Sequence, residues 1–481
     1  MACLGLPLSE AGEKKIIQHA IAWLDGRVDR HTVIGISMVA DTSLLYSLPL
    51  AQAIRRKFPC IIIGGGYAAS FAYPILLEAF AELFDAVVVG PGEVAVLGIL
   101  DRVAAGNPNL AGIPGVACSP GRRAVLELPA VTVPIQELPT LDFSVLENRE
   151  VFLTAAYDAS RGCPRQCEFC PEAVLVPRFQ VKSADQVGAD LAEIRRWLPN
   201  CEGVALTDPT FGIPGARFEG ICGQLAQEGL PYGFETRCDE FPERLYPALS
   251  GHCQVISFGL EAARSELLRR MNKTQDPAEY LGGMRRNAQL CFENDILPVV
   301  SFMPNYPLAT EADLEADLTF ARDLRSAYAN QLGARRGLVF DGGFPYIVSY
   351  GRRHYLQMPE LRSQGVTFAA AFPPRYQSFN VPPLRYNVVD ASISLPFARA
   401  SYGFTALQRL GVTEEGRTNE ALRRCLRSVN LSLLRGSADD PADLYLDTDR
   451  DVINFGYVAT NLCRLNTRYP QYRFRDALAY F

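Results

Sequence analysis

The chain has 481 residues, of which 48% are hydrophobic and 21% are charged. This length predicts two or three domains, and this composition is typical of a globular protein with large hydrophobic cores. The formal net charge of −6 gives no electrostatic basis for binding nucleic acid, so we expect no nucleic-acid partner.

The start of the chain and its apolar segments argue against a secreted protein and against a membrane-spanning protein. The first residues lack the charged start and long apolar core of a secretory signal. No segment has the roughly 18 uninterrupted apolar residues that a membrane-spanning helix needs. Thirteen cysteines in such a chain are typical of reduced thiols. We therefore expect a cytoplasmic protein with no membrane span.

Residues 1–105 alternate between helical and strand patterns, which is typical of a Rossmann-like α/β domain. We expect helices over 10–24, 44–58 and 75–84, and strands over 33–38, 60–63 and 85–89. Glycine-rich turns, Gly64-Gly65-Gly66 and Gly90-Pro91-Gly92, follow the second and third strands. Because ligands of such domains bind at the carboxyl ends of the strands, these turns predict a binding crevice. Residues 106–150, rich in proline, are expected to form a linker.

Residues 151–330 repeat strand–helix units with polar residues at the strand ends. We expect strands over 152–157, 203–206, 232–236, 255–260 and 296–303, and a helix that Ser183 caps and that ends at Trp197. Such repeats predict a partial (β/α)6 barrel with its active site at the carboxyl ends of the strands. Residues 331–481 are expected to form an α+β extension that covers the open side of the barrel and the substrate.

Three cysteines, Cys163, Cys167 and Cys170, follow the first barrel strand at the spacing C-x₃-C-x₂-C. Thiolates are the usual ligands of iron–sulfur clusters, and most clusters use four of them. Three on one loop leave one iron open to a small molecule. Two other interpretations are ordinary thiols on a turn, and a zinc site, which would need a fourth ligand that the nearby sequence lacks.

This spacing, with Phe169 before the third cysteine, resembles the signature of the radical SAM superfamily. Later segments resemble the strand-end motifs of that family in the expected order: D-P-T-F at 208–211, F-G-L-E-A at 258–262, R-R-M-N-K-T at 269–274 and S-F-M-P-N-Y-P at 301–307. The resemblance covers about residues 33–330. It implies a 4Fe–4S cluster on the three cysteines, with S-adenosylmethionine bound to the open iron.

The resemblance also implies an activity and a set of binding residues. An electron from a reductase, flavodoxin or ferredoxin would cleave S-adenosylmethionine to a 5′-deoxyadenosyl radical. The backbone of Phe169 would lie beside the adenine. Residues at the strand ends would hold the remainder of S-adenosylmethionine: Asp208, Glu235, Arg237, Ser257 and Glu261. For each of these five, a helix cap or an ion pair at the barrel rim is the alternative interpretation.

The N-terminal stretch resembles the cobalamin-binding domain that precedes many radical SAM barrels. It differs in showing about three strands instead of five, and in lacking the motif D-x-H-x-x-G. Asp29-Arg30-His31 comes near this motif, but Gly35 is one position late. We therefore expect a shortened domain in which cobalamin binding is doubtful.

A shortened domain disfavours methyl transfer, so the expected outcome is radical dehydration or deoxygenation of a diol in a sugar-like small molecule. The layout resembles the radical SAM diol-dehydratase type of apramycin (aminoglycoside) biosynthesis. The alternative is a cobalamin-dependent radical SAM C-methyltransferase. A non-catalytic module with a vestigial cluster is a third interpretation.

Dehydration needs an acid or base to help a hydroxyl group leave. The C-terminal region is rich in aromatic and polar residues and offers three catalytic candidates: Asp341, Tyr346 and His354.

Overall fold

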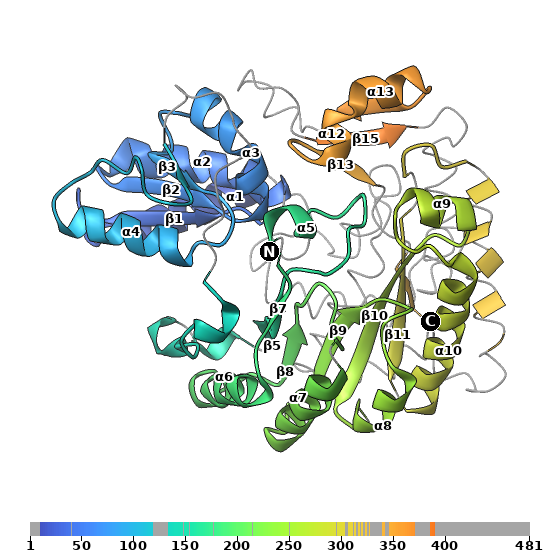
Figure 1. Ribbon diagram of the computed structural model, residues 1–481. Coiled ribbons are helices and arrows are strands. Elements are labelled where there is room, and N and C mark those ends of the chain that lie inside the picture. The colour runs from blue at the N-terminus through green and yellow to red at the C-terminus, as the bar shows by residue number, and fades with distance from the viewer. Residues whose placement is uncertain are drawn as a thin grey trace.

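The computed structural model describes residues 10–118, 133–303, 306–327 and 346–370, apart from short gaps within these ranges, together with 339–341 and 385–389. The described chain contains a Rossmann-like N-terminal unit, a parallel barrel sheet and a small antiparallel sheet (Figure 1). None of the helices in these ranges has the length and apolar character that crossing a membrane requires.

The N-terminal unit is a four-stranded sheet in the order β1-β2-β3-β4, with helices on both faces. Its elements are α1 (Glu10–Leu24), β1 (Val33–Ser37), α2 (Asp41–Lys57), β2 (Ile61–Gly65), α3 (Tyr67–Ala79), β3 (Ala86–Val88), α4 (Glu93–Ala104) and β4 (Val116–Ala117). The first three strands are parallel and β4 is antiparallel to β3. Ile62 faces the core under α2 and α3, whereas its neighbour Ile63 faces the core formed with α4. The Rossmann-like class is confirmed, and the sheet includes residues beyond 105.

Helix α3 begins earlier than the expected range of 75–84. Gly66 has a φ of 96°, and a Cβ there would lie 2.8 Å from the carbonyl oxygen of Met38. Only glycine therefore lets the chain turn directly from β2 into the helix. The first turns of α3 are buried on nearly every side, so they lack the amphipathic pattern that would have predicted them.

The barrel sheet has six strands in the order β12-β11-β10-β9-β8-β5, all parallel. The strands are β5 (Thr154–Tyr157), β8 (Gly203–Leu206), β9 (Tyr232–Thr236), β10 (Cys253–Glu261), β11 (Leu297–Phe302) and β12 (Val339–Asp341). The described helices of this unit are α6 (Ala184–Trp197), α7 (Gly215–Gln227), η5 (Glu243–Leu245), α8 (Tyr246–Leu249), α9 (Ser265–Arg270) and α10 (Pro277–Glu293). They lie along the outer side of the sheet (Figure 1). The partial (β/α)6 barrel is confirmed, and its sixth strand comes from the region expected to be the C-terminal extension.

The linker and the C-terminal segment both contact the barrel. The linker contains η2 (Ile135–Glu137), η3 (Phe143–Val145) and η4 (Arg149–Val151). The amide of Leu141 donates to Asp190 in α6 at 2.9 Å. Beyond the barrel, β13 (Ile347–Ser349), α12 (Arg353–Leu356), α13 (Met358–Ser363), β14 (Thr367–Ala370) and β15 (Arg385–Val389) form the antiparallel sheet and its helices, as the α+β expectation requires.

Ser183 caps α6 as predicted. Its hydroxyl accepts from the amide of Gln186 at 3.2 Å, and the Gln186 side chain accepts from the amide of Ser183 at 3.0 Å. We expect Ser183→Ala to lower the free energy of unfolding by about 1 kcal/mol, because this capping box is lost. Urea unfolding of this variant beside Ser183→Asp, which keeps a capping acceptor, tests the prediction. Equal losses in both variants would contradict it.

Candidate active site

The three cysteines lie on one loop between β5 and α6. The loop leaves the barrel through β6 (Ser160–Arg161), passes α5 (Glu172–Leu175) and returns through β7 (Gln180–Val181), which pairs antiparallel with β6. Gly162 opens the loop with a φ of 75°, and a Cβ there would lie 2.6 Å from the carbonyl oxygen of Arg178. Glycine therefore allows the two ends of the loop to cross closely.

Cys163, Cys167 and Cys170 are all half-buried and close enough to influence one another's charge. Burial raises the pKa of the Cys163 thiol, and raises that of Cys170 to about 11. Such thiols become thiolates when a metal replaces their protons. Among the described residues, no three His, Cys, Asp or Glu side chains converge on one point as a single metal ion requires. Cluster ligands can each bind a separate iron, so a cluster does not require such a convergence.

Glu172 ties the two ends of the cysteine loop to the N-terminal unit. Its carboxylate accepts from the amide of Gly162 at 3.1 Å and from the hydroxyl of Tyr67, the first residue of α3. Burial raises the pKa of Glu172. A second contact, the ion pair between Arg161 and Glu93, joins the loop to the first residue of α4. The carboxyl edge of the N-terminal sheet therefore meets the cysteine loop directly.

Asp208 lies after β8 as predicted, and it is buried against the strand that leads into the loop. It accepts from the amide of Ala159 at 3.1 Å and from the hydroxyl of Ser160, and burial raises its pKa to about 6. These contacts position the entry to the cysteine loop. Binding of S-adenosylmethionine by Asp208 stays a prediction.

The R-R-M-N-K-T segment holds the middle of the loop. The amide of Glu168 donates to the carbonyl of Met271 at 2.9 Å, and the Asn272 side chain donates to the carbonyl of Gln166 at 2.8 Å. Lys273 places its ammonium 5.6 Å from the centre of the Phe169 ring. Asn272 has a φ of 48°, which asparagine tolerates better than most residues. The segment therefore fixes the backbone on both sides of Cys167.

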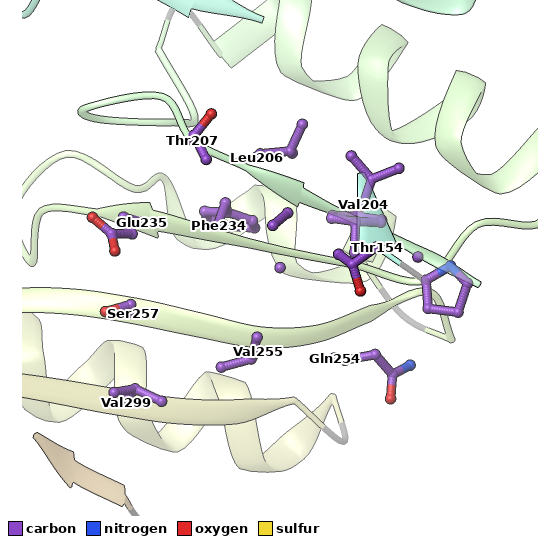
Figure 2. A pocket seen from close by; sticks show the side chains of 15 residues that line it. Thr154, Val204, Leu206, Thr207, Phe234, Glu235, Gln254, Val255, Ser257 and Val299 are labelled. Carbon is purple, nitrogen blue, oxygen red and sulfur yellow. The ribbon is translucent and has the colours of Figure 1, made fainter. Parts of the chain in front are cut away.

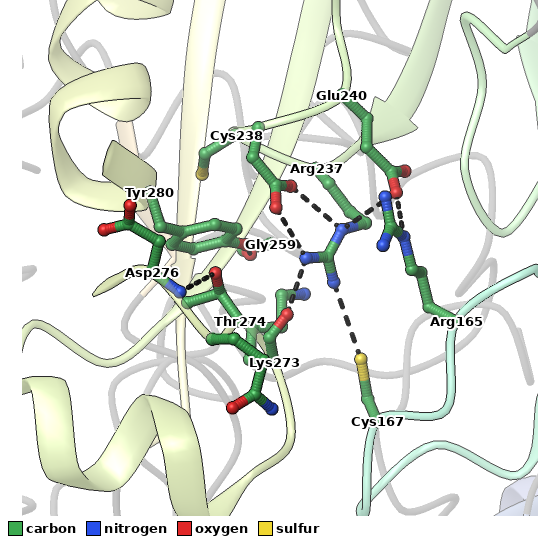
Figure 3. Close-up of polar contacts among 12 residues, drawn as sticks. Arg165, Cys167, Arg237, Cys238, Glu240, Gly259, Lys273, Thr274, Asp276 and Tyr280 are labelled. Carbon is green, nitrogen blue, oxygen red and sulfur yellow. Dashed lines mark hydrogen bonds and ion pairs between the residues drawn. The ribbon is translucent and has the colours of Figure 1, made fainter. Parts of the chain in front are cut away.

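Arg237 connects this segment to the cysteines (Figure 3). Its guanidinium donates to both oxygens of Asp239, at 3.0 and 2.9 Å, and to the carbonyl of Lys273 at 2.6 Å. It also lies 3.6 Å from the Cys167 sulfur. Burial works against its charge, but the hydrogen bonds to Asp239 outweigh this and raise the pKa of Arg237. Arg237 thus supplies a fixed positive charge beside Cys167, one of the three loop cysteines.

Glu261 ends β10 with a φ of 70° and is paired with Lys273 at 3.0 Å. Both side chains are buried. Burial works against the charge of Lys273, but the carboxylate of Glu261 and the nearby Cys167 raise its pKa. A positive φ strains the backbone of a residue with a side chain. Such strained residues are often found at functional sites.

The inner face of the barrel sheet forms a cavity of about 370 Å³ (Figure 2). Glu235 and Ser257 line it at the carboxyl side of β9 and β10, and Thr207 follows β8. The remaining lining is mostly small or apolar, with Val204, Ala205, Val255 and Val299 among it. The structure therefore groups Glu235 and Ser257 on the cavity wall, and Arg237, Glu261 and Phe169 around the cysteine loop.

Two of the three catalytic candidates meet in the C-terminal segment. The Tyr346 hydroxyl lies 2.6 Å from Nδ1 of His354, and the Tyr306 hydroxyl lies 3.3 Å from Nε2. Asp341 ends β12 beside Ser301, and its side chain lies outside the described part of the chain. Arg353, next to His354, pairs with Glu168 of the cysteine loop at 2.9 Å. This places the Tyr346–His354 pair close to the loop, and its catalytic role stays a prediction.

Burial lowers the pKa of His354 to about 4, with the charge of Arg353 adding to the effect. The unfolded chain takes up a proton near pH 6.5 that the folded protein takes up only near pH 4, so stability falls as pH decreases across this window. We expect the free energy of unfolding to fall by about 1.4 kcal/mol for each pKa unit of the shift. Urea unfolding at pH 7 and pH 5 should show a weaker pH dependence for His354→Gln than for the wild type. The exposed His31→Gln serves as control, and identical pH dependence in all three proteins would refute the assignment.

Comparison with protein families identifies the barrel. Residues 157–321, which hold the cysteine loop and the strands around the cavity, match the model of the radical SAM superfamily. This segment is a radical SAM domain.

Two curated relatives each match part of the chain. The hopanoid C-3 methylase of Methylococcus capsulatus is 28% identical over 241 residues, which cover 47% of this chain and 44% of that protein. The 2-(S-pantetheinyl)-carbapenam-3-carboxylate methyltransferase of Streptantibioticus cattleyicolor is 27% identical over 178 residues, 34% of this chain and 26% of that protein. The chain thus matches less than half the length of each.

Solved structures extend the likeness beyond the radical SAM domain. The methyltransferase TsrM from Kitasatospora setae, with cobalamin and a [4Fe-4S] cluster bound, aligns with a TM-score of 0.64 at 17% identity over 82% of this chain and 87% of that one. The cobalamin-dependent enzyme OxsB, with aqua-cobalamin and S-adenosylmethionine bound, aligns with a TM-score of 0.60 at 15% identity over 96% of this chain and 76% of that one. The two-unit fold is therefore shared with both structures.

Proposed function

We propose that this protein is a cobalamin-dependent radical SAM methyltransferase acting on a small molecule. The observation that carries the proposal is the double contact between the carboxyl edge of the N-terminal sheet and the cysteine loop, through Tyr67–Glu172 and Glu93–Arg161. A group held at that edge would adjoin the cluster. Both curated relatives, and TsrM among the solved structures, are named as methylases or methyltransferases.

This proposal reverses the order of the two outcomes expected from the sequence. The sequence alone favours dehydration, because it shows only about three strands of the N-terminal domain and this length disfavours cobalamin binding. The structures with bound cobalamin align over 82% and 96% of this chain, so the shared fold includes its N-terminal unit. None of the relatives described above is named as a dehydratase, and the diol-dehydratase interpretation has no support among them.

The residues at the carboxyl edge fit a corrinoid. Gly66 and Gly90 adopt positive φ values of 96° and 77°, which bring the backbone of both turns to the edge without side chains. Glu93, beside the second turn, has one buried carboxylate oxygen with no hydrogen-bond partner. Because a buried unpaired acceptor is costly, its presence supports a ligand that donates a hydrogen bond at this edge.

The chain's own residues would have separate tasks in this activity. When bound, a cluster would supply one-electron reducing chemistry and cobalamin would supply methyl-transfer chemistry. Cys163, Cys167 and Cys170 would hold the cluster, while Arg237 and Lys273 fix the loop and place positive charge beside it. The cavity on the barrel's inner face, with Glu235 and Ser257 among its polar groups, would hold the organic reactants away from water.

The proposal is tested with S-adenosylmethionine labelled with deuterium in its methyl group. Anaerobically reconstituted protein, hydroxocobalamin and a strong reductant are incubated with a panel of aminoglycosides and carbapenams. We expect a product that carries the labelled methyl group and forms only when cobalamin is present. A product lighter by water, formed equally without cobalamin, would establish dehydration instead.

A further inference from the structure

Three buried side-chain atoms in the described part of the chain lack a hydrogen-bond partner: Arg55 Nε, Glu93 Oε2 and Arg352 Nε. Arg55 lies away from the cysteine loop and uses its other nitrogens on the carbonyls of Cys60 and Leu83 and on Asp85. The other two atoms lie where the N-terminal unit meets the rest of the molecule. They call for a separate explanation, because folded proteins rarely leave buried polar atoms unpaired.

Glu93 occupies the turn between β3 and α4 at the carboxyl edge of the sheet. Its Oε1 pairs with Arg161, which leads into the cysteine loop, and its Oε2 is the unpaired atom. The carboxylate is therefore held in place by one oxygen and offers the other as an acceptor. A carboxylate oxygen accepts hydrogen bonds only, so the missing group is a donor.

Arg352 packs against α3, the helix that follows the preceding glycine turn. Its guanidinium carbon is 5.8 Å from the centre of the Phe71 ring, in the second turn of α3. Its neighbour Gly351 comes so near α3 that a Cβ would lie 2.8 Å from the carbonyl oxygen of Phe71. Because a guanidinium only donates, the group missing at Arg352 Nε is an acceptor.

We propose that Glu93 and Arg352 are specificity residues that bind peripheral amides of the corrinoid ring, an inference that rests on the proposed cobalamin dependence. A primary amide offers an N–H donor for Glu93 Oε2 and a carbonyl acceptor for Arg352 Nε. A carboxylate in place of an amide at Glu93 would offer no donor and would be repelled by the Glu93 carboxylate. Glu93 and Arg352 therefore favour a ligand whose peripheral groups are neutral amides over one whose peripheral groups are carboxylates or phosphates.

The test compares hydroxocobalamin with its b-, d- and e-monocarboxylic acid derivatives, in each of which one peripheral amide is a carboxylate. Equilibrium dialysis gives the affinities of the full-length protein without any turnover. We expect one derivative to bind the wild type at least about tenfold more weakly than hydroxocobalamin, which is the order expected for a lost hydrogen bond to a charged group. Glu93→Gln should abolish that difference, because a glutamine amide can donate to the carboxylate.

Two further variants complete the design. Arg352→Gln should weaken binding of hydroxocobalamin about tenfold, as expected for the loss of a charged donor. Glu82→Gln, an exposed carboxamide substitution in the same unit, should change nothing. Because Glu93→Gln is expected to gain affinity for a derivative, misfolding cannot imitate the result.

The outcomes separate this inference from the proposed function. If the wild type binds hydroxocobalamin, while all three derivatives bind equally well and Glu93→Gln and Arg352→Gln behave as Glu82→Gln does, the assignment of Glu93 and Arg352 is overturned and the proposed function stands. If the wild type binds no hydroxocobalamin, both fail.

Discussion

Replacing Cys167 by alanine should abolish the iron–sulfur cluster and reduce 5′-deoxyadenosine formation to the background rate. Cys167 is the middle cysteine of the loop and contacts Arg237 through its sulfur, while Asn272 and Met271 hold the backbone of its neighbours Gln166 and Glu168. With two of three thiolates left, the cluster loses one of its few protein bonds and S-adenosylmethionine loses its binding partner. Iron and sulfide content, visible absorption and chromatography of 5′-deoxyadenosine under a strong reductant measure the effect.

Cys118 provides the matched control for this substitution. It is half-buried like the loop cysteines, and burial raises its pKa as well, but it lies just after β4 in the N-terminal unit. Cys118→Ala should keep the iron content and the cleavage of S-adenosylmethionine. Retained 5′-deoxyadenosine formation in Cys167→Ala, or stoichiometric zinc in the anaerobic wild type, would contradict the cluster assignment.

Replacing Lys273 by methionine should lower the free energy of unfolding by about 3 kcal/mol. The substitution leaves the Glu261 carboxylate buried without its counter-ion, and breaking one side of a buried ion pair typically costs this much. Urea unfolding of the protein without cluster gives the difference directly.

The paired variant Glu261→Gln with Lys273→Met should recover most of this loss, because no unpaired charge then remains buried. Lys57→Met is the control, since the exposed Lys57–Asp25 pair at 3.0 Å should contribute at most about 1 kcal/mol. Strictly additive losses in the paired variant would show that Lys273 and Glu261 do not depend on one another. The affinity of Glu261→Gln for S-adenosylmethionine tests the separate prediction that Glu261 binds it.

Local patterns in the sequence predict much of this fold. Apolar runs bounded by polar strand ends locate five of the barrel strands, and Ser183 with Gln186 marks the start of α6. The cysteine spacing predicts the cluster loop because it depends on one short segment. Helix α3 was predicted too late because its first turns are buried all round. The sixth strand, β12, has only three residues and carries too little pattern to detect.

Contacts between distant segments could not be read from the sequence. Asp208 follows β8, and Glu235 lies near the end of β9. Asp208 is buried under the entry to the cysteine loop, whereas Glu235 lines the cavity. Only the contacts of Asp208 with Ala159 and Ser160, which are distant in the sequence, decide between these positions. The contacts of Glu172 with Tyr67 and of Arg161 with Glu93 join residues of different structural units, and no spacing rule relates them. The glycine turns directly before Tyr67 and Glu93 are the feature of the sequence that points to a binding site at this edge of the sheet.

The dependence of S-adenosylhomocysteine formation on cobalamin tests the central claim most directly. Transfer of a methyl group from S-adenosylmethionine leaves S-adenosylhomocysteine, whereas reductive cleavage leaves 5′-deoxyadenosine and methionine. Reconstituted protein with a strong reductant is assayed for both products with and without hydroxocobalamin. We expect S-adenosylhomocysteine to appear only with hydroxocobalamin, and Glu82→Gln to behave as the wild type does. Formation of 5′-deoxyadenosine alone, unchanged by cobalamin, would contradict it.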